Sequence, residues 1–198
     1  MHNLLDPTSL VKDFGYIGIL TAVFLESGVF FGFFLPGDSL LFPAGLLASQ
    51  HYLNLVGVIV VSISGAILGN SAGYYTGVKF GRSLFSKPGS FWFSPHRIDE
   101  AHRFFEKEGP QSLILARFIP IIRTFLPIAA GTAKMRYRNF LLFNSIGGCL
   151  WGILLPILGF TLGKTVPSID KYLLPAIFVI VILSLLPAIW HHRSKKTR

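Results

Sequence analysis

The chain has 198 residues, of which 52% are apolar and 14% charged, and its mean hydropathy is +0.59. Because soluble domains carry about 25% charged residues, this composition disfavours a water-soluble globule and a disordered chain. The net charge of +9 does not indicate nucleic acid as a partner, since the basic residues lie mostly between apolar stretches. The composition predicts an integral membrane protein with one domain.

Five apolar stretches divide the chain. The second and fourth exceed the roughly 30 Å hydrocarbon core at about 1.5 Å per residue, so they are predicted to span the membrane as helices. The fifth is also long enough and predicts an additional C-terminal transmembrane helix at 172–190. In chain order the stretches are Phe14–Gln50, Asn54–Val78, Ser112–Ala133, Asn139–Gly163 and Tyr172–Trp190.

Prolines interrupt the first and third stretches. Pro36 and Pro43 fall in the first, and Pro120 and Pro127 fall in the third. Since proline stops a helix from continuing undisturbed, we expect a break at each of them. Both stretches are predicted to be re-entrant hairpins, whose tips are shaped by Pro36, Gly37 and Pro120.

The distribution of Lys and Arg supports this topology. The connector Lys79–Pro110 and the link Lys134–Arg138 are both basic. A crossing between them would put them on opposite sides of the membrane, against the positive-inside tendency, and a re-entrant hairpin removes that conflict. The basic tail Arg193–Arg198 then lies in the cytoplasm. Within the connector, Ser94–Glu108 predicts a short helix, either in the headgroup region or solvated.

The two hairpins and the spans after them form an internal repeat. One span separates the hairpins, so the second unit is predicted to be inverted relative to the first, an arrangement typical of secondary transporters. We expect a single membrane domain over 1–198: repeat 1 at about 14–81, an amphipathic connector at 82–110, repeat 2 at about 111–163 and the C-terminal span. The matching positions include Pro36 and Pro120, Pro43 and Pro127, Gly45 and Gly131, Gly77 and Gly159, and Gly81 and Gly163.

Four ionisable residues lie well inside the interrupted stretches: Glu26, Asp38, Arg117 and Arg123. Unpaired charges at the membrane centre would cost about 2.5–3.5 kcal/mol each. We therefore expect a polar cavity or ion pairs, with at least one carboxylate within direct or one-water reach of an arginine. One interpretation is purely structural ion pairs. The other is phosphate recognition by the arginines, with the carboxylates as proton-coupling groups.

Other polar residues carry weaker signals. Asn70 and Asn144 lie within spans and are expected to form interhelical hydrogen bonds or to line a polar path. Trp151 is interpreted as a packing residue or an interface anchor. The 6 histidines show no spacing suited to a metal, and no cofactor motif or catalytic set is visible, so no metal and no cofactor are expected.

The residues together resemble the DedA family of membrane proteins, which share the so-called SNARE-associated or VTT domain. The resemblance covers roughly residues 15–165 and depends on a combination of short motifs. These are Phe24-Leu25-Glu26, Phe34-Leu35-Pro36-Gly37-Asp38, Ala44-Gly45, Arg117-Phe118-Ile119-Pro120 with Arg123, Ala130-Gly131, Met135, Phe140, Asn144, Gly147 and Trp151.

The resemblance implies a protein of the bacterial or archaeal cytoplasmic membrane that has two opposed re-entrant hairpins and moves lipids between leaflets. Members are linked to undecaprenyl phosphate recycling and phospholipid transport, with dependence on the proton motive force. The functional acidic pair of the family matches Glu26 and Asp38, and its arginine pair matches Arg117 and Arg123.

The sequence therefore predicts a lipid flippase and not an enzyme. Its partners are expected to be a phosphate-bearing lipid, with undecaprenyl phosphate or a phospholipid as the best candidates, and protons. Three alternatives stay open: a proton- or cation-coupled exporter of small solutes, a membrane-embedded lipid phosphatase, and a non-transporting organiser of membrane complexes.

Overall fold

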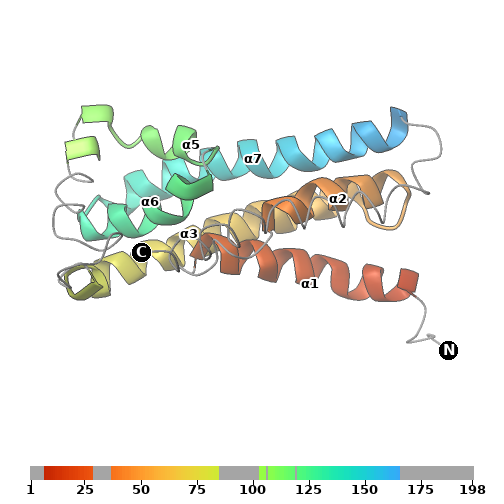
Figure 1. Cartoon of the computed structure of the whole chain (residues 1–198), viewed down its shortest axis with the longest axis horizontal. Coiled ribbons are helices and arrows are strands. Elements are labelled where there is room, and N and C mark those ends of the chain that lie inside the picture. Colours follow the sequence, from red (N-terminus) through yellow and green to blue (C-terminus); the bar gives the residue numbers. More distant parts are fainter. Residues whose placement is uncertain (1–6, 29–36, 85–102, 106, 119, 166–198) are drawn as a thin grey trace, which may run out of the picture. The chain divides into compact units, whose positions relative to one another are not determined.

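The described part of the chain is helical and contains no strand. The computed structural model describes residues 7–28, 37–84, 103–105, 107–118 and 120–165. This confirms the predicted all-α class. The helices, shown in Figure 1, are α1 (Pro7–Gly28), α2 (Gly37–Ser49), α3 (Leu55–Leu84), α5 (Ser112–Ala116), α6 (Pro120–Thr132) and α7 (Tyr137–Thr165). The predicted C-terminal span and most of the predicted connector lie outside these residues.

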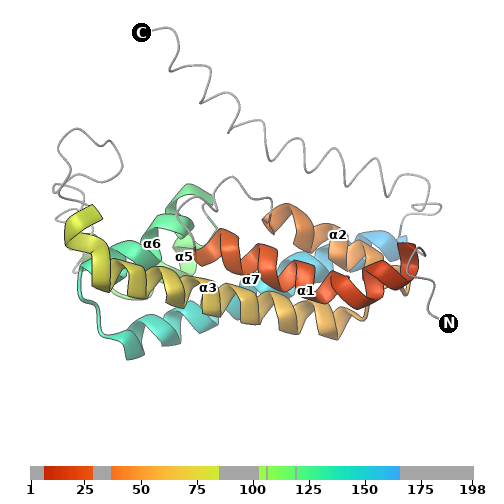
Figure 2. The ribbon, with the colours of Figure 1, turned by 90° about the horizontal axis from the view of Figure 1, so that it is seen from below.

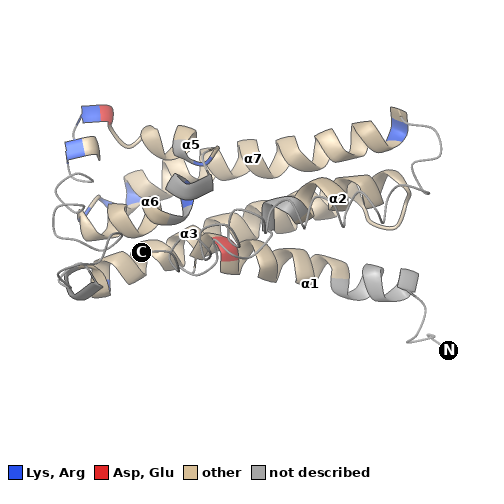
Figure 3. Ribbon diagram, in the orientation of Figure 1, with Lys and Arg blue, Asp and Glu red and all other residues tan. Residues whose placement is uncertain are grey.

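Helices α3 and α7 match the two predicted spans. Leu55–Gly81 and Tyr137–Thr165 are 27 and 29 residues long, each with a mean hydropathy of 1.9, and Figure 3 shows few charged positions along them. Their buried share is only 33%, so large apolar side chains face outward and suit lipid better than water. On α7 these include Leu142, Leu150, Leu154, Leu158 and Leu162.

The prolines inside the hairpin stretches do not break their helices as expected. Both α2 and α6 are 13 residues long, and they continue through Pro43 and Pro127 respectively. The expectation of a break at these two positions is wrong, because an internal proline removes one backbone hydrogen bond that a membrane helix can replace through its neighbours. Gly37 and Pro120 are the first residues of α2 and α6, and Pro36 lies outside the described residues.

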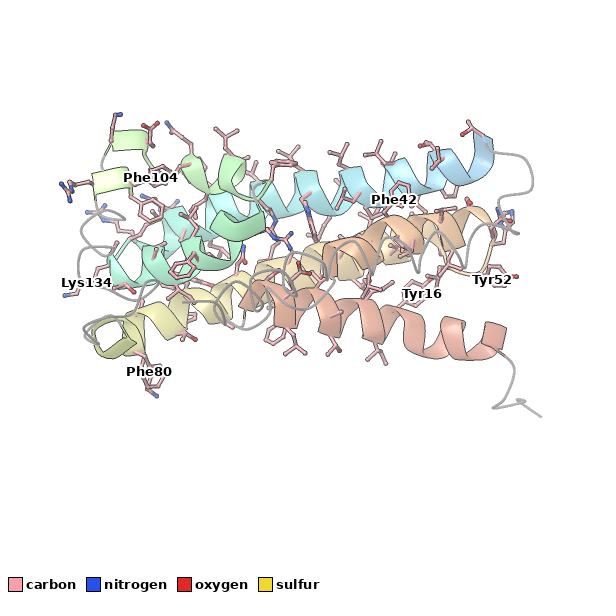
Figure 4. All side chains as sticks on the ribbon, in the orientation of Figure 1. Tyr16, Phe42, Tyr52, Phe80, Phe104 and Lys134 are labelled. Carbon is pink, nitrogen blue, oxygen red and sulfur yellow. The ribbon has the colours of Figure 1, made fainter. Side chains whose placement is uncertain are left out.

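The described helices belong to two compact units. Unit 1 comprises Met1–Val23, Phe34–Gly65 and Gly152–Arg198, and unit 2 comprises Phe24–Phe33 and Ala66–Trp151. Within unit 1, α3 begins with a complete cap: the Asn54 side-chain oxygen accepts from the backbone N–H groups of Val56 and Gly57 at 2.9 and 3.2 Å. The Asn54 N–H donates to the hydroxyl of Tyr16 at 2.7 Å, and Tyr16 and Tyr52 lie at this end of the unit in Figure 4.

In unit 2, α6 packs against the C-terminal half of α3 (Figures 1 and 2). Glycines allow the two backbones to touch: a Cβ on Gly77 would collide with the Ile128 carbonyl oxygen, and one on Gly131 with the Tyr74 carbonyl oxygen. Such small-residue crossings are typical of membrane helix pairs, because close backbones gain dispersion contacts.

Unit 1 contains an equivalent crossing of α2 with the C-terminal half of α7. A Cβ on Gly159 would collide with the Phe42 carbonyl oxygen, and one on Gly45 with the Pro156 carbonyl oxygen. The glycines that the sequence repeat matches, Gly77 with Gly159 and Gly131 with Gly45, thus make equivalent helix contacts in the two units.

An aromatic and aliphatic core holds the helices of unit 2 around its polar centre. The buried residues are Tyr74, Leu113, Leu126, Ala130 and Phe140. The rings of Tyr74 and Phe140 stack with centroids 4.6 Å apart. Because these residues come from α3, α5, α6 and α7, the core fixes the four helices around the site described next.

Candidate functional site

A buried ion pair joins α1 to α6 within unit 2. An Arg123 guanidinium nitrogen donates to the Glu26 carboxylate, and Glu26 is only 6% exposed. This confirms that a carboxylate lies within salt-bridge reach of an arginine. Glu26 lies in the last turn of α1, where the helix dipole disfavours a negative charge. A cation at this position therefore compensates both the burial and the dipole.

Arg117 is held where the chain leaves α5. It caps the C-terminus of that helix, and its N–H bonds back to the Ile114 carbonyl at 3.3 Å. The side chain is 5% exposed and reaches α7, where Nη1 donates to the Asn144 side-chain oxygen at 3.0 Å. The side chain passes Gly147 and Gly148, where a Cβ would be in ordinary van der Waals contact with Arg117 atoms at 3.5–3.6 Å.

Two asparagines link α3 and α7 beside this arginine. The Asn70 amide nitrogen donates to the Asn144 side-chain oxygen at 2.7 Å, and both side chains are buried. This confirms the interhelical hydrogen bonding expected of them. The Asn144 amide nitrogen donates to the Ile67 carbonyl of α3 at 3.4 Å. Asn144 therefore uses both ends of its amide, one toward Arg117 and Asn70 and the other toward the α3 backbone.

Trp151 lies against both arginines. The centres of the Arg117 and Arg123 guanidinium groups are each 5.4 Å from the centroid of its ring, and the residue is buried. Sequence reasoning assigned Trp151 only to packing or anchoring and missed this contact. A signal was available, because Asn144, Gly148 and Trp151 recur at helical spacing and so share one face of α7.

The arginines and asparagines line one small pocket of unit 2, whose volume of about 10 Å³ has room for a single water molecule. Its wall combines two guanidinium groups, two amides and three apolar side chains, a combination suited to an anion with an apolar attachment. Asp38 lies in the first turn of α2, and its side chain lies outside what the structure describes. The lining residues are Asn70, Leu113, Arg117, Arg123, Leu126, Pro127 and Asn144.

Pro127 lines the pocket and also affects the backbone of α6. Because proline lacks an N–H, it cannot donate the helical hydrogen bond to the carbonyl four residues earlier, which is that of Arg123. The Pro127 ring lies close to α3, since a Cβ on Gly73 would be 3.3 Å from the Pro127 Cβ. Pro127 therefore packs closely against α3 and changes the backbone hydrogen bonding of α6 beside the pocket. Among the described residues no group of three or more His, Cys, Asp or Glu is placed to hold a metal ion.

Comparison with known proteins gives consistent matches. Residues 35–161 match the model of the VTT domain. The chain is 41% identical over 194 residues to protein DedA of Escherichia coli, covering 96% of this chain and 88% of the relative. It is 42% identical over 197 residues to an uncharacterized membrane protein of Mycobacterium tuberculosis, with 96% and 86% covered.

A more distant relative is the inner membrane protein YqjA of Escherichia coli, 34% identical over 157 residues, with 79% of this chain and 71% of the relative covered. No solved structure matches the chain. Together with the apolar helices α3 and α7, these relatives place the protein in a membrane. None of the three relatives named here has the name of an enzyme.

Proposed function

We propose, on the premise that this chain belongs to the DedA family of VTT-domain membrane proteins, that it moves a phosphate-bearing lipid between the leaflets of the membrane. The best candidates for the lipid are undecaprenyl phosphate and a phospholipid. The movement is coupled to the proton gradient. No covalent chemistry on the lipid is part of the proposal.

The observation that carries this proposal is a pair of arginines on one pocket wall, of which Arg117 is buried and Arg123 is largely buried. Arg117 and Arg123 both line the pocket, and both guanidinium groups lie over Trp151. Planar guanidinium forks bind phosphate oxygens through two parallel hydrogen bonds. A buried ion pair alone is a poor stabilising device, because the desolvation cost offsets much of the attraction. Ligand binding therefore explains the presence of two arginines inside a membrane protein better than stabilisation of the fold does.

The start of α6 adds to the attraction for an anion. Pro120 is the first residue of the helix and Arg123 lies in its first turn. The N-terminus of a helix carries partial positive charge and free N–H groups, which favour phosphate. A phosphate near Arg123 would thus meet both a full charge and a helix dipole.

Glu26 supplies the link to protons. It pairs with Arg123, so an ionised Glu26 competes with phosphate for the same guanidinium. Protonation of Glu26 removes this competition and favours phosphate binding, while its ionisation favours release. Asp38, in the first turn of α2, is proposed as the second proton-coupling group.

We also propose that the chain forms an inverted repeat of two re-entrant hairpins, whose tips include Pro36, Gly37 and Pro120. The equivalent glycine contacts of α6 with α3 and of α2 with α7 support the repeat. The helix at 172–190 is proposed to cross the membrane and to leave the C-terminus in the cytoplasm, and the name of the relative YqjA supports a location in the inner membrane.

Leaflet exchange in liposomes tests the function. Purified protein is reconstituted with a fluorescent undecaprenyl phosphate analogue or a fluorescent phospholipid, with and without a pH gradient. We expect exchange of a phosphate-bearing lipid that the gradient accelerates and that Arg117→Gln abolishes, whereas the matched variant Arg136→Gln, at an exposed position, behaves as wild type. Transport of a small solute without lipid exchange would identify an exporter, and release of inorganic phosphate would identify a phosphatase.

A further inference from the structure

We infer that Asn144 is a positioning residue of the phosphate site: it orients Arg117 along the pocket wall while adding no negative charge, and Asn70 holds Asn144 in place. This inference rests on the proposed function, because it assumes that the pocket takes the phosphate group of a lipid. The inference explains why the residue beside the buried Arg117 is an asparagine and not an aspartate.

The hydrogen bonds fix the order of this chain of contacts. Arg117 Nη1 lies 3.0 Å from the Asn144 side-chain oxygen and 3.4 Å from the Asn144 backbone carbonyl oxygen. The same side-chain oxygen accepts from the Asn70 amide at 2.7 Å. Asn144 is 2% exposed, so these bonds form out of contact with bulk water, where they constrain the guanidinium most strongly.

Asn70 acts on the arginine, directly or through Asn144, in either orientation of its amide. Rotated by 180°, its oxygen lies 3.1 Å from Arg117 Nη1 and its nitrogen 3.1 Å from the Ser27 carbonyl oxygen at the end of α1. Asn70 therefore orients the arginine directly in one orientation and through Asn144 in the other. In both it contributes a neutral dipole to the pocket wall.

The neutrality of these amides matters for an anion. A carboxylate at position 144 could accept the same bond from Arg117, but it would place a full negative charge on the wall of the same pocket, close to the phosphate ligand. Two like charges in close proximity repel by about 1 kcal/mol in water and by several times that in a protein of lower dielectric constant. An amide retains the orientation and avoids this repulsion.

Trp151 provides the measurement, since both guanidinium groups contact its ring. The full chain carries 3 tryptophans, so replacing Trp92 and Trp190 by Phe leaves Trp151 as the fluorophore. Dodecyl phosphate is titrated into the detergent-solubilised protein and Trp151 emission is recorded. Dodecyltrimethylammonium, a cationic amphiphile of equal chain length, controls for binding of the alkyl chain.

Asn144→Asp and Asn70→Asp are the decisive variants, and Ser62→Ala is the control. Ser62 is fully buried in unit 1, and its hydroxyl bonds the Val58 carbonyl of its own helix at 2.6 Å. We expect both aspartates to weaken dodecyl phosphate binding about tenfold or more, with the melting temperature retained. The control is expected to bind within about twofold of wild type. A merely structural role for Asn144 predicts that binding falls only where the melting temperature falls, because aspartate keeps the acceptor for Arg117 and loses only the donor to the Ile67 carbonyl.

The outcomes separate the inference from the function on which it rests. Wild-type binding that Arg117→Gln abolishes but that both aspartate variants retain overturns the inference and leaves the proposed function intact. No saturable binding to wild type overturns both. The expected binding pattern without leaflet exchange in liposomes supports the inference and contradicts transport. If Asn144→Asp does not fold, Asn70→Asp decides by the same criterion.

Discussion

Glu26 and Arg123, which are 97 positions apart in the sequence, form a buried ion pair between the last turn of α1 and the first turn of α6. Figure 3 shows an acidic position near the C-terminal end of an otherwise uncharged stretch of α1. The pair neutralises two charges in a place where neither could remain alone, because an uncompensated buried ion costs several kcal/mol. It also sets one edge of the pocket that Arg123 lines.

The ion pair predicts a non-additive effect on stability. Glu26→Gln or Arg123→Gln alone leaves one buried charge uncompensated and is expected to lower the free energy of unfolding by about 3–5 kcal/mol. The double variant removes both charges and is expected to recover much of that loss. The stability of the two single variants and the double variant is measured by thermal unfolding in detergent, with size-exclusion chromatography to monitor the loss of folded protein. A double variant that loses the sum of the two single effects would contradict a direct pairing energy.

Lipid transport is predicted to require the planar guanidinium groups of Arg117 and Arg123 as well as their charge. Lysine keeps the charge but cannot form the two parallel bonds to a phosphate. Arg117→Lys and Arg123→Lys should therefore insert and fold but lose most lipid exchange in liposomes, measured at matched protein amounts. Arg136→Lys, at an exposed position, is the matched control. Wild-type exchange in both site variants would favour a purely electrostatic role.

The carboxylates are predicted to carry the pH dependence of transport. Protonation of Glu26 frees Arg123 for phosphate, so exchange should depend on pH in the wild type. Glu26→Gln, although less stable than the wild type, and Asp38→Asn should both give enough folded protein for reconstitution, and their exchange should no longer respond to pH or to a proton gradient. Liposome exchange across a pH series compares the three proteins. Identical pH profiles would exclude these residues as proton-coupling groups and would favour an anchoring role.

The glycine crossings are predicted to be intolerant of a single methyl group. Gly131→Ala and Gly45→Ala would place Cβ against the carbonyl oxygens of Tyr74 and Pro156, and each should lower the melting temperature and the yield of folded protein. Gly18 in α1 is the matched control, since a Cβ there meets nothing within 4 Å. Gly18→Ala should stabilise the helix by about 1 kcal/mol at most. Equal melting temperatures for all three would exclude tight packing at the crossings.

The link between α6 and α7 is predicted to face the cytoplasm. Lys134, Arg136 and Arg138 are exposed there, and short cytoplasmic loops carry the Lys/Arg excess of membrane proteins. Arg136→Cys in a Cys149→Ser background should react with a membrane-impermeant maleimide only after the cells are opened. Strong labelling of intact cells would contradict the re-entrant second hairpin.

Local patterns predicted some elements better than others. The apolar stretches around α3 and α7 are long and contain no charged residue, so their helices followed from composition alone. The breaks expected at Pro43 and Pro127 were wrong, because the effect of a proline depends on neighbouring helices that replace the lost hydrogen bond. The start of α1 at Pro7, ahead of its apolar stretch, reflects the suitability of proline for the first turn of a helix.

The sequence by itself determined the membrane class, the two spans and the four residues whose charges demand compensation, because composition, periodicity and the cost of burying a charge are properties of local segments. Only the tertiary structure decided that Glu26 pairs with Arg123, that Asn144 holds Arg117, and that Trp151 lies against both guanidinium groups. These contacts join residues of different helices, and the glycines that bring backbones together set which side chains meet. The sequence shows which charged residues need partners, and the packing of the helices determines which residues those partners are.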